Sequence, residues 1–367
     1  MKICVDVQAA VTQRAGVGRY TKALVEHLGA AAMDDSLSLF YFDFKGQGEP
    51  LKAANATVSA TRWLPGRLVQ LAWKTMSWPP FDMFAGPADV YHFPNFIIPP
   101  LSRGRSVVTI HDASFLRFPE MAEERNLRFL KARIKDTVQR ADAIIAVSKF
   151  GADEIVSLLG AAPEKIHVIY EGISPSFAPT EPAAAMEELQ GIGMDKPFIL
   201  TVGTLEPRKN TMFLIDVFEK MKDFDGYLAI VGIPGWKCQP ILDRMASSSR
   251  AKNIRYLRYV TDKQLKALYT RAELFMFPSL YEGFGFPPLE AMACGAPVIS
   301  AATGSLPEVL GDAALVIDGF DANHWAAQAT SRLGDRSMLL KGRTQAAKYT
   351  WSKAAADTWN VYRKVAG

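Results

Sequence analysis

The sequence predicts an α/β protein of two doubly wound domains, each a parallel sheet covered by helices on both faces. Two observations favour this fold class. The chain has 367 residues, of which 49% are apolar and 22% charged, so it can bury a substantial core and is long enough for two domains. Short apolar runs also alternate with helical stretches, a pattern typical of parallel sheets with helical crossovers.

The expected strands fall into two sets. In the first half they are 3–7, 37–42, 107–110, 143–147 and 167–170, with helices at 19–28, 123–140 and 149–159 between them. In the second half they are 198–202, 227–231, 254–257, 274–277 and 298–300, again separated by helices. Each half therefore has the alternation that one doubly wound domain requires.

The boundary between the domains is predicted within 174–196, where Pro175, Pro179 and Pro182 occur beside small residues. This places a first domain over 1–175 and a second over 176–350. In doubly wound sheets ligands bind beyond the carboxyl ends of the strands, so the expected site is the cleft between the domains.

Charge and cysteine content narrow the class of protein. A net charge of +4 is too small to indicate nucleic-acid binding, and we expect no nucleic-acid partner. Cys4, Cys238 and Cys294 lack the paired spacing of zinc sites or disulfide frameworks, which favours buried thiols in a reducing compartment. The start of the chain is typical of a strand rather than a signal peptide, and no apolar run is long enough to span a bilayer. We expect a cytoplasmic protein.

The segment after the apolar run 274–277 is the most informative part of the chain. Pro287 and Pro288 favour a helix start directly behind a glycine loop, because proline is tolerated in the first helical turn. The free N–H groups and positive dipole end of a helix favour phosphate, and glycines let a ligand approach the backbone. The sequence therefore predicts a diphosphate site here. The loop residues expected at this site are Gly283, Phe284, Gly285 and Phe286.

Two carboxylates flank this loop. Glu282 precedes it, and Glu290 is expected in the first helical turn. An ionised carboxylate only accepts hydrogen bonds, so its natural partners are hydroxyls, a sugar for one residue and a ribose for the other. The two residues alone leave another interpretation open, in which Glu290 stabilises the helix dipole and Glu282 is a solvated loop residue.

A second group of candidates follows the strand 198–202. Gly203 ends this strand, Asn210 is the expected N-cap of the next helix, and Arg208 and Lys209 lie between them. Cations placed where a departing diphosphate develops charge lower the barrier to its departure. A solvated Arg-Lys pair is the alternative, but cations near a helix N-terminus are unfavourable to that helix, so the position needs another reason.

His111 ends the apolar strand 107–110 and is the best candidate among the five histidines. A histidine at a strand end is more often structural than catalytic. The neighbouring Asp112 could equally cap the following turn.

Two stretches resemble the retaining glycosyltransferases of group 1, also called glycosyltransferase family 4. One is Glu-Gly-Phe-Gly-Phe-Pro-Pro-Leu-Glu at 282–290, followed by Ala-Met-Ala-Cys-Gly-Ala-Pro-Val-Ile, and the other is Gly-Thr-Leu-Glu-Pro-Arg-Lys-Asn at 203–210. Many members have arginine directly after the glycine, and Thr204 makes this loop similar to the mannosyltransferase branch. The resemblance implies the GT-B fold, two Rossmann-like domains around a cleft, with the last helix within 351–367 crossing back onto the first domain.

The resemblance also implies a role for each site residue. Arg208 and Lys209 would stabilise the departing diphosphate, while His111 and Glu282 would hold the transferred sugar and Glu290 the ribose. Tyr259 and Val260 would contact the base through main-chain groups. The remaining positions assigned to the donor are Gly16, Gly18, Gly203, Thr204 and Gly232, although packing of small residues is an alternative for Gly16 and Gly18 and a simple turn for Gly232.

A dinucleotide-binding dehydrogenase is another interpretation of the glycines after the first strand. Gly16-Val-Gly-Arg-Tyr-Thr21 lacks the third glycine of that fingerprint, and eight residues separate Val7 from Gly16. A phosphorylase would need a lysine for pyridoxal phosphate, and none is identifiable.

The resemblance implies a mechanism without a metal or cofactor. No carboxylate for a double displacement is evident. The resemblance instead implies attack on the same face as the departing phosphate, with that phosphate accepting the proton of the acceptor hydroxyl. We expect hexose transfer, with mannose from GDP-mannose favoured, onto a saccharide or lipid-linked acceptor. A non-catalytic sugar-nucleotide sensor or partner subunit is the alternative.

Basic residues recur along 124–140 between apolar ones, and Trp63, Trp73 and Trp78 lie upstream. Together they indicate an anionic membrane surface as a candidate partner, with peripheral association on the inner face of the membrane. A solvated face over a packed core is the other interpretation.

Overall fold

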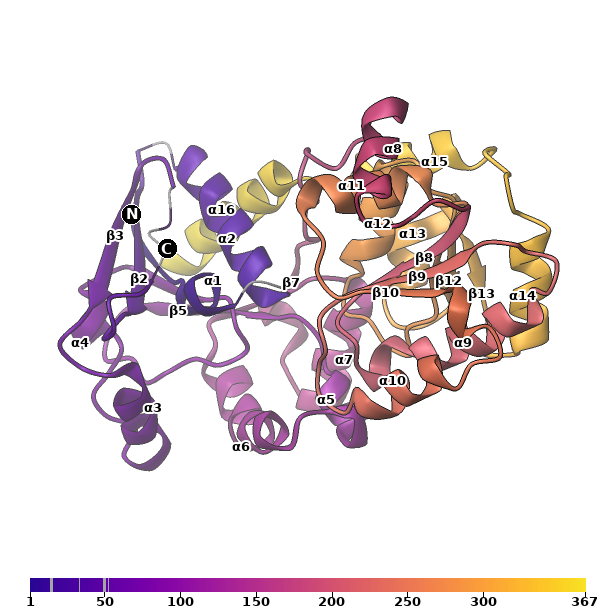
Figure 1. The fold of residues 1–367 in the computed structure, drawn as a ribbon. Coiled ribbons are helices and arrows are strands. Elements are labelled where there is room, and N and C mark those ends of the chain that lie inside the picture. Colours follow the sequence, from indigo (N-terminus) through magenta and orange to yellow (C-terminus); the bar gives the residue numbers. More distant parts are fainter. Residues whose placement is uncertain (14–15, 33, 49–50, 52) are drawn as a thin grey trace. The chain divides into compact units, whose positions relative to one another are not determined.

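The computed structural model describes residues 1–13, 16–32, 34–48, 51 and 53–367. The chain divides into two compact units (Figure 1). The first comprises 1–116, 124–172 and 350–367, and the second comprises 117–123 and 173–349. The chain leaves the first unit for the long segment of the second between Gly172 and Ile173, just before the stretch 174–196.

The first unit is built on a parallel sheet with the strand order β3-β2-β1-β4-β5-β6-β7. The strands are β1 (Lys2–Asp6), β2 (Ser36–Phe42), β3 (Ala56–Thr61), β4 (Val90–Phe93), β5 (Arg105–Ile110), β6 (Ala143–Ala146) and β7 (Ile166–Val168). β3 and β4 were not expected from the sequence. β3 is an edge strand of mostly small and polar residues, and β4 is a four-residue strand close to prolines, so neither has a long apolar run.

Helices flank this sheet on both sides. They are α1 (Gln8–Thr12), α2 (Val17–Ala30), α3 (Gly66–Thr75), α4 (Asp82–Ala85), α5 (Ser114–Arg117), α6 (Glu124–Arg140), α7 (Lys149–Leu159) and α16 (Trp351–Ala366). The C-terminal helix α16 packs against α2, where Trp359 Nε1 donates to the Leu28 carbonyl oxygen at 3.1 Å. Tyr362 Oη lies 2.6 Å from Nδ1 of His92, which is completely buried on β4. The end of the chain therefore completes the first unit.

The second unit has a six-stranded parallel sheet with the order β10-β9-β8-β11-β12-β13. The strands are β8 (Phe198–Val202), β9 (Tyr227–Val231), β10 (Ile254–Leu257), β11 (Leu274–Phe277), β12 (Val298–Ala301) and β13 (Leu315–Ile317). The bounds of the first four agree with the apolar runs. β13 was missed because it is only three residues long. Two parallel sheets with helical crossovers confirm the predicted fold class.

The helices of the second unit are α8 (Pro182–Gln190), α9 (Thr211–Lys220), α10 (Gln239–Ala246), α11 (Asp262–Arg271), α12 (Phe286–Ala293), α13 (Leu306–Leu310), α14 (Ala322–Thr330) and α15 (Leu339–Ala346). Asn210 is the N-cap residue of α9, as predicted, but it lacks the side-chain bond that is typical of an N-cap. It occupies this position with φ 54°. Asparagine tolerates this left-handed conformation better than most residues, which accounts for its presence.

The strand order positions the candidate site. In the second unit the order reverses between β8 and β11, which are hydrogen-bonded neighbours. Loops that leave the carboxyl ends of two such strands diverge and create a binding crevice. The segments that follow β8 and β11 therefore start side by side, although more than seventy residues separate the two strands in sequence.

Candidate functional site

Three predicted residues meet beyond the carboxyl ends of β8 and β11. Lys209 Nζ lies 2.6 Å from Glu282 Oε1, and Arg208 Nη1 lies 3.2 Å from Glu282 Oε2. The side chains of Arg208, Lys209 and Glu282 are 18%, 15% and 9% exposed, so the cluster is mostly buried but retains some accessible surface. This geometry excludes the interpretation of Arg208 and Lys209 as a solvated pair.

Glu206 is a fourth member of the cluster that sequence reasoning missed. It is 2% exposed, and its Oε1 accepts a bond from Arg208 Nη2 at 2.6 Å. Burial raises the pKa of Glu206 despite the neighbouring cations. For Glu282 burial also acts to raise the pKa, but the charges of Lys209 and Arg208 outweigh it and lower that pKa. Glu282 is therefore the ionised acceptor of the cluster.

The loop that carries Glu282 is held by Gly304 and Ser305, which lie outside the stretch 282–290. Ser305 N donates to the Glu282 carbonyl oxygen at 3.0 Å, and Ser305 Oγ lies 2.9 Å from the Phe284 carbonyl oxygen. Gly304 has φ +58°, and a Cβ at this position would lie 2.4 Å from the Glu282 carbonyl oxygen. Only glycine fits such an approach, so Gly304 and Ser305 fix the main chain at Glu282.

The helix behind this loop begins where the prolines indicated. α12 starts at Phe286 after Gly285, which has φ +107°, and prolines follow in its first turn. The predicted position of Glu290 in the first turn is wrong, because the helix begins one residue before Pro287 and Glu290 falls in its second turn. The positive end of the α12 dipole is thus next to Gly283, Phe284 and Gly285.

Glu290 is buried and bonded to a neighbouring helix. It is 1% exposed, and its Oε2 accepts a hydrogen bond from Tyr269 Oη on α11 at 3.2 Å. The interpretation as a dipole-stabilising acid of the first turn does not hold for this position. A role at a ribose stays a prediction, since it requires Glu290 to become accessible.

The other donor positions of the second unit lie after β8, β9 and β10. A Cβ on Gly232, which has φ +154°, would lie 1.8 Å from the Gly203 carbonyl oxygen. The close approach of these two backbone segments therefore explains the glycine at position 232. Thr204 follows Gly203 and is half-buried. Tyr259 is 78% exposed and Val260 half-buried. Their contacts with a nucleotide remain predictions.

In the first unit His111 is enclosed by other residues. Its Nε2 lies 2.8 Å from the Pro94 carbonyl oxygen, and its Nδ1 lies 3.1 Å from Glu171 Oε1. The His111 and Glu171 side chains are 12% and 3% exposed. Asp112 Oδ1 accepts bonds from Ser114 N and Oγ, so it caps the turn after β5, as its alternative interpretation stated. Sequence reasoning missed Glu171, because it follows a short strand outside any recognised motif.

Different structural constraints act on Gly16 and Gly18, the two glycines that follow β1. A Cβ on Gly18 would lie 2.0 Å from the Gln13 carbonyl oxygen, which favours the packing interpretation. Gly16 precedes α2 with φ +55°, and a Cβ at this position would meet no described residue within 4 Å. The short helix α1 intervenes between β1 and Gly16, so the tight turn of a dinucleotide fingerprint is absent from this segment.

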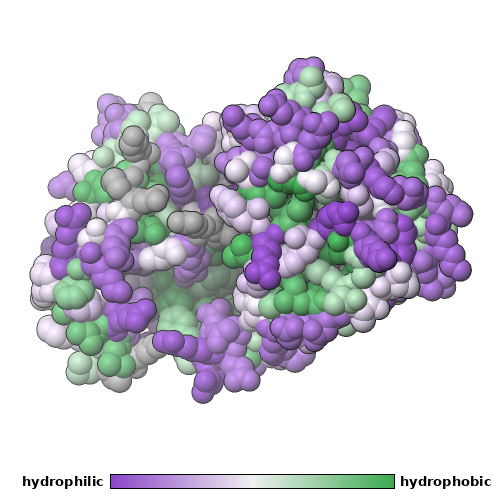
Figure 2. Space-filling model, in the orientation of Figure 1, coloured by the Kyte–Doolittle hydropathy of each residue, from purple (hydrophilic) through white to green (hydrophobic). Residues whose placement is uncertain are grey.

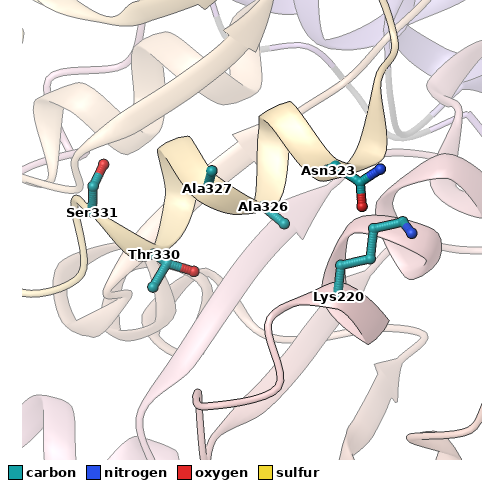
Figure 3. Close-up of a pocket in the computed structure, with 6 residues that line it drawn as sticks. All are labelled: Lys220, Asn323, Ala326, Ala327, Thr330 and Ser331. Carbon is teal, nitrogen blue, oxygen red and sulfur yellow. The ribbon is translucent and has the colours of Figure 1, made fainter.

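A shallow pocket of about 420 Å³ lies elsewhere in the second unit, between α14 and the end of α9 (Figure 3). It contains one charged side chain, Lys220, beside Asn323, and no carboxylate, so it offers no pair of groups for acid–base chemistry. Within the ranges that the structure describes, no three His, Cys, Asp or Glu side chains converge on a metal position. In the same ranges no helix combines the length and apolarity needed to cross a bilayer.

Two Rossmann-like units, with a cationic cluster at the switch point of the second, have the architecture of the glycosyltransferases that use nucleotide sugars. The chain belongs to the glycosyltransferases of group 1 and family 4: "Glycosyl transferases group 1" matches residues 185–350 and "Glycosyltransferase Family 4" matches residues 14–177. An O-antigen chain mannosyltransferase B from Escherichia coli is 31% identical over 99% of this chain and 100% of its own length.

Solved structures share the fold. A sucrose-phosphate synthase from Thermosynechococcus elongatus superposes with a TM-score of 0.78 at 18% identity, covering 99% of this chain and 98% of that one. HepE from Anabaena, in complex with UDP and glucose, gives a TM-score of 0.72 at 17% identity over 99% and 100% of the two chains. These likenesses establish the GT-B fold.

Proposed function

We propose that the protein transfers a hexose with retention of configuration, mannose from GDP-mannose, onto a saccharide or lipid-linked saccharide during O-antigen or related polysaccharide assembly. The cluster of Arg208, Lys209 and Glu282 carries this proposal. Arg208 and Lys209 can donate hydrogen bonds to a diphosphate, and the ionised carboxylate of Glu282 can accept hydrogen bonds from sugar hydroxyls. The choice of mannose rests on the full-length similarity to an O-antigen mannosyltransferase and on Thr204 after Gly203.

The cluster suggests how the donor is recognised. In the free protein Glu282 and Glu206 balance the charges of Arg208 and Lys209. A diphosphate would compete for the two cations, and the Glu282 carboxylate would then accept hydrogen bonds from hydroxyls of the attached sugar. The positive end of α12 would add to the stabilisation of the phosphate charge. Neither step calls for a metal ion or cofactor.

The bond changes follow from the same arrangement. The bond between the anomeric carbon and the phosphate oxygen breaks, and a bond from that carbon to the acceptor oxygen forms on the same face. The proton of the acceptor hydroxyl passes to the departing phosphate. Lys209 and Arg208 lower the barrier by stabilising the charge that develops on the leaving nucleoside diphosphate.

The test is a transfer assay with GDP-mannose, UDP-glucose and ADP-glucose, and with product anomers assigned by NMR. We expect turnover with GDP-mannose, an α-linked product, and loss of at least about 100-fold in rate in Lys209→Ala and Glu282→Ala. Lys196→Ala is the matched control, since this lysine pairs on the surface with Asp225 at 2.9 Å. A β-linked product would refute retention, and donor binding without turnover on any mannosylated acceptor would favour the sensor.

We further propose that the first unit rests on an anionic membrane surface. Large apolar side chains are exposed around α3, where Figure 2 has hydrophobic residues at the surface. They are Trp63 at 72%, Leu68 at 55%, Leu71 at 57%, Met76 at 66% and Trp78 at 58% exposure.

The neighbouring helix α6 supplies the charge. Arg133 Nη2 donates to the Trp73 carbonyl oxygen at 2.6 Å and so joins α6 to α3. Exposed basic residues line the outer face of α6, namely Arg125, Arg128, Lys131 and Lys135. An apolar patch beside basic residues suits the interface of a bilayer with anionic headgroups, where a lipid-linked acceptor would be presented.

Flotation with liposomes tests the membrane proposal. We expect binding to vesicles that contain phosphatidylglycerol, weaker binding at high salt, and loss of binding when Leu68 and Leu71 are both replaced by Ser. Leu340→Ser is the matched control, since Leu340 is 75% exposed in the second unit. Equal binding to zwitterionic and anionic vesicles, or none to either, would refute the proposal.

A further inference from the structure

The pairing of His111 with Glu171 fixes where protons can lie. A carbonyl oxygen only accepts hydrogen bonds, so the 2.8 Å contact with Pro94 requires a hydrogen on His111 Nε2. The 3.1 Å contact between Nδ1 and Glu171 Oε1 requires another, because a bare nitrogen and a carboxylate both only accept. One proton is therefore held between Nδ1 and Oε1, either on the imidazole or on the carboxyl group.

The surroundings keep this proton in the pair. Both side chains are nearly inaccessible, and the ring of Tyr20 packs edge-on against His111 with centroids 4.6 Å apart. Burial acts to lower the pKa of His111, but the hydrogen bond and charge of Glu171 outweigh it and raise that pKa. Burial raises the pKa of Glu171, and this effect outweighs the hydrogen bond from His111, which acts to lower that pKa. With one shared proton the pair carries no net charge, which its burial favours.

Other titratable or charged groups face the pair from each element packed against it. Arg19 and Tyr20 come from α2, and His92 lies on β4. Asp112 follows His111 on the same loop. Burial lowers the pKa of His92 to about 3 and raises that of Tyr20 above its ordinary value, so neither of them exchanges a proton near neutral pH. The exchangeable proton belongs to His111 and Glu171.

We propose that Glu171 is a positioning residue for the transfer reaction, which orients the His111 ring and shares one proton with it. The inference deepens the proposed function and rests on it for the role of His111 at the transferred sugar. With Nδ1 held by Glu171 and Nε2 by Pro94, rotation of the ring breaks both bonds. Misplacement of such a group by about 1 Å can cost about 100-fold in rate.

Two substitutions at Glu171 separate its effect on the orientation of the His111 ring from the effect of its charge. In Glu171→Gln the side-chain amide can donate to Nδ1 of a neutral imidazole, so the ring keeps its orientation without the shared proton. In Glu171→Ala the bond is absent, and burial alone acts on the imidazole. Glu164→Gln is the control, because Glu164 is an exposed glutamate of the same unit.

The first measurement is an NMR titration of the full-length protein with labelled histidine, in which the His111 signal is assigned by its loss in His111→Asn. We expect His111 in the wild type and in Glu164→Gln to titrate above its ordinary value of 6.5. It should titrate below 6.5 in both Glu171 variants, where burial is no longer opposed. An unchanged His111 titration in Glu171→Gln would overturn the shared proton, whether or not any transfer activity is found.

The second measurement is the rate of transfer from GDP-mannose. We expect kcat to fall at least about tenfold in Glu171→Ala and to recover to within about threefold of wild type in Glu171→Gln, with the KM for the donor little changed. Equal kcat in all three proteins would overturn the positioning role, and so would an equal loss in both variants. Absence of turnover in the wild type would instead refute the proposed function, and the NMR result would still stand.

Discussion

Lys209→Ala tests how the cluster holds the loop that carries Glu282. The substitution removes the Nζ to Oε1 contact of 2.6 Å and leaves Arg208 as the cation still paired with the mostly buried Glu282 carboxylate. At an effective dielectric constant of about 20, the gross attraction across this distance is about 6 kcal/mol. Desolvation offsets much of it, and breaking a buried pair from one side typically costs about 3–5 kcal/mol.

The expected loss is smaller than this range, because Arg208 Nη1 still reaches Glu282 Oε2 at 3.2 Å and Lys209 is 15% exposed. We expect about 2 kcal/mol for local opening of the loop 279–285. The double variant Lys209→Ala with Glu282→Gln should recover most of this loss, since a neutral amide does not require a cation.

Hydrogen exchange measured by mass spectrometry reports this local opening without assuming that both units unfold together. A loss of about 2 kcal/mol corresponds to about 30-fold faster exchange of the loop amides. Lys196→Ala is again the control, because its pair with Asp225 is exposed and should contribute less than about 1 kcal/mol. If Lys209→Ala and Lys196→Ala change exchange in this loop equally, the cluster does not hold it.

Three further outcomes follow from other contacts. Gly304→Ala places a Cβ 2.4 Å from the Glu282 carbonyl oxygen in a left-handed conformation that alone costs about 1 kcal/mol, so we expect a lower melting temperature and loss of transfer; an unchanged melting curve would contradict this geometry. Because the pKa of Glu282 is lowered in the folded protein, its ionisation stabilises the fold above pH 4.5, and this stability is lost as the pH falls through the folded value. The free energy of unfolding of Glu282→Gln should therefore fall less steeply at acid pH than that of the wild type, and parallel profiles would contradict the lowered pKa. Burial raises the pKa of the Cys4 and Cys294 thiols to about 12, so alkylation of the native protein at about pH 8 should be confined to Cys238, as peptide mass spectrometry can check; rapid labelling of either buried thiol would count against the packing.

The sequence was sufficient for the fold class, and it placed three charged candidates within two recognisable motifs. Arg208, Lys209 and Glu282 each follow an apolar run, and the end of a parallel strand is where such residues meet a ligand. Their mutual contact depends on β8 and β11 being neighbours, and this pairing is a property of the topology that no local pattern encodes. The roles assigned to Glu290 and Tyr259 stay predictions, because Glu290 is buried against Tyr269 and Tyr259 is largely exposed.

The residues that support the site could not be found from sequence patterns. Glu171 and Ser305 act through side-chain contacts that join distant segments, such as the 60 residues between His111 and its partner. Glu206 bonds to Arg208 only two residues away, but no local pattern shows that this pair belongs to the cluster around Glu282. Each is an ordinary polar residue in its local context. Nothing in the local sequence explains the glycine at position 304. The structure does, because a Cβ there would lie 2.4 Å from the Glu282 carbonyl oxygen.

The helix α16 has a consequence for how the protein is made. Its Trp359 and Tyr362 contact Leu28 and His92, so the first unit gains its last buried surface only after residue 350 has been synthesised. During translation the second unit can finish folding first, although it is encoded later. A fragment that stops at Gly172 would expose the face that α16 covers, and expression of the two units as separate proteins would therefore require residues 350–367 to be rejoined to the first one.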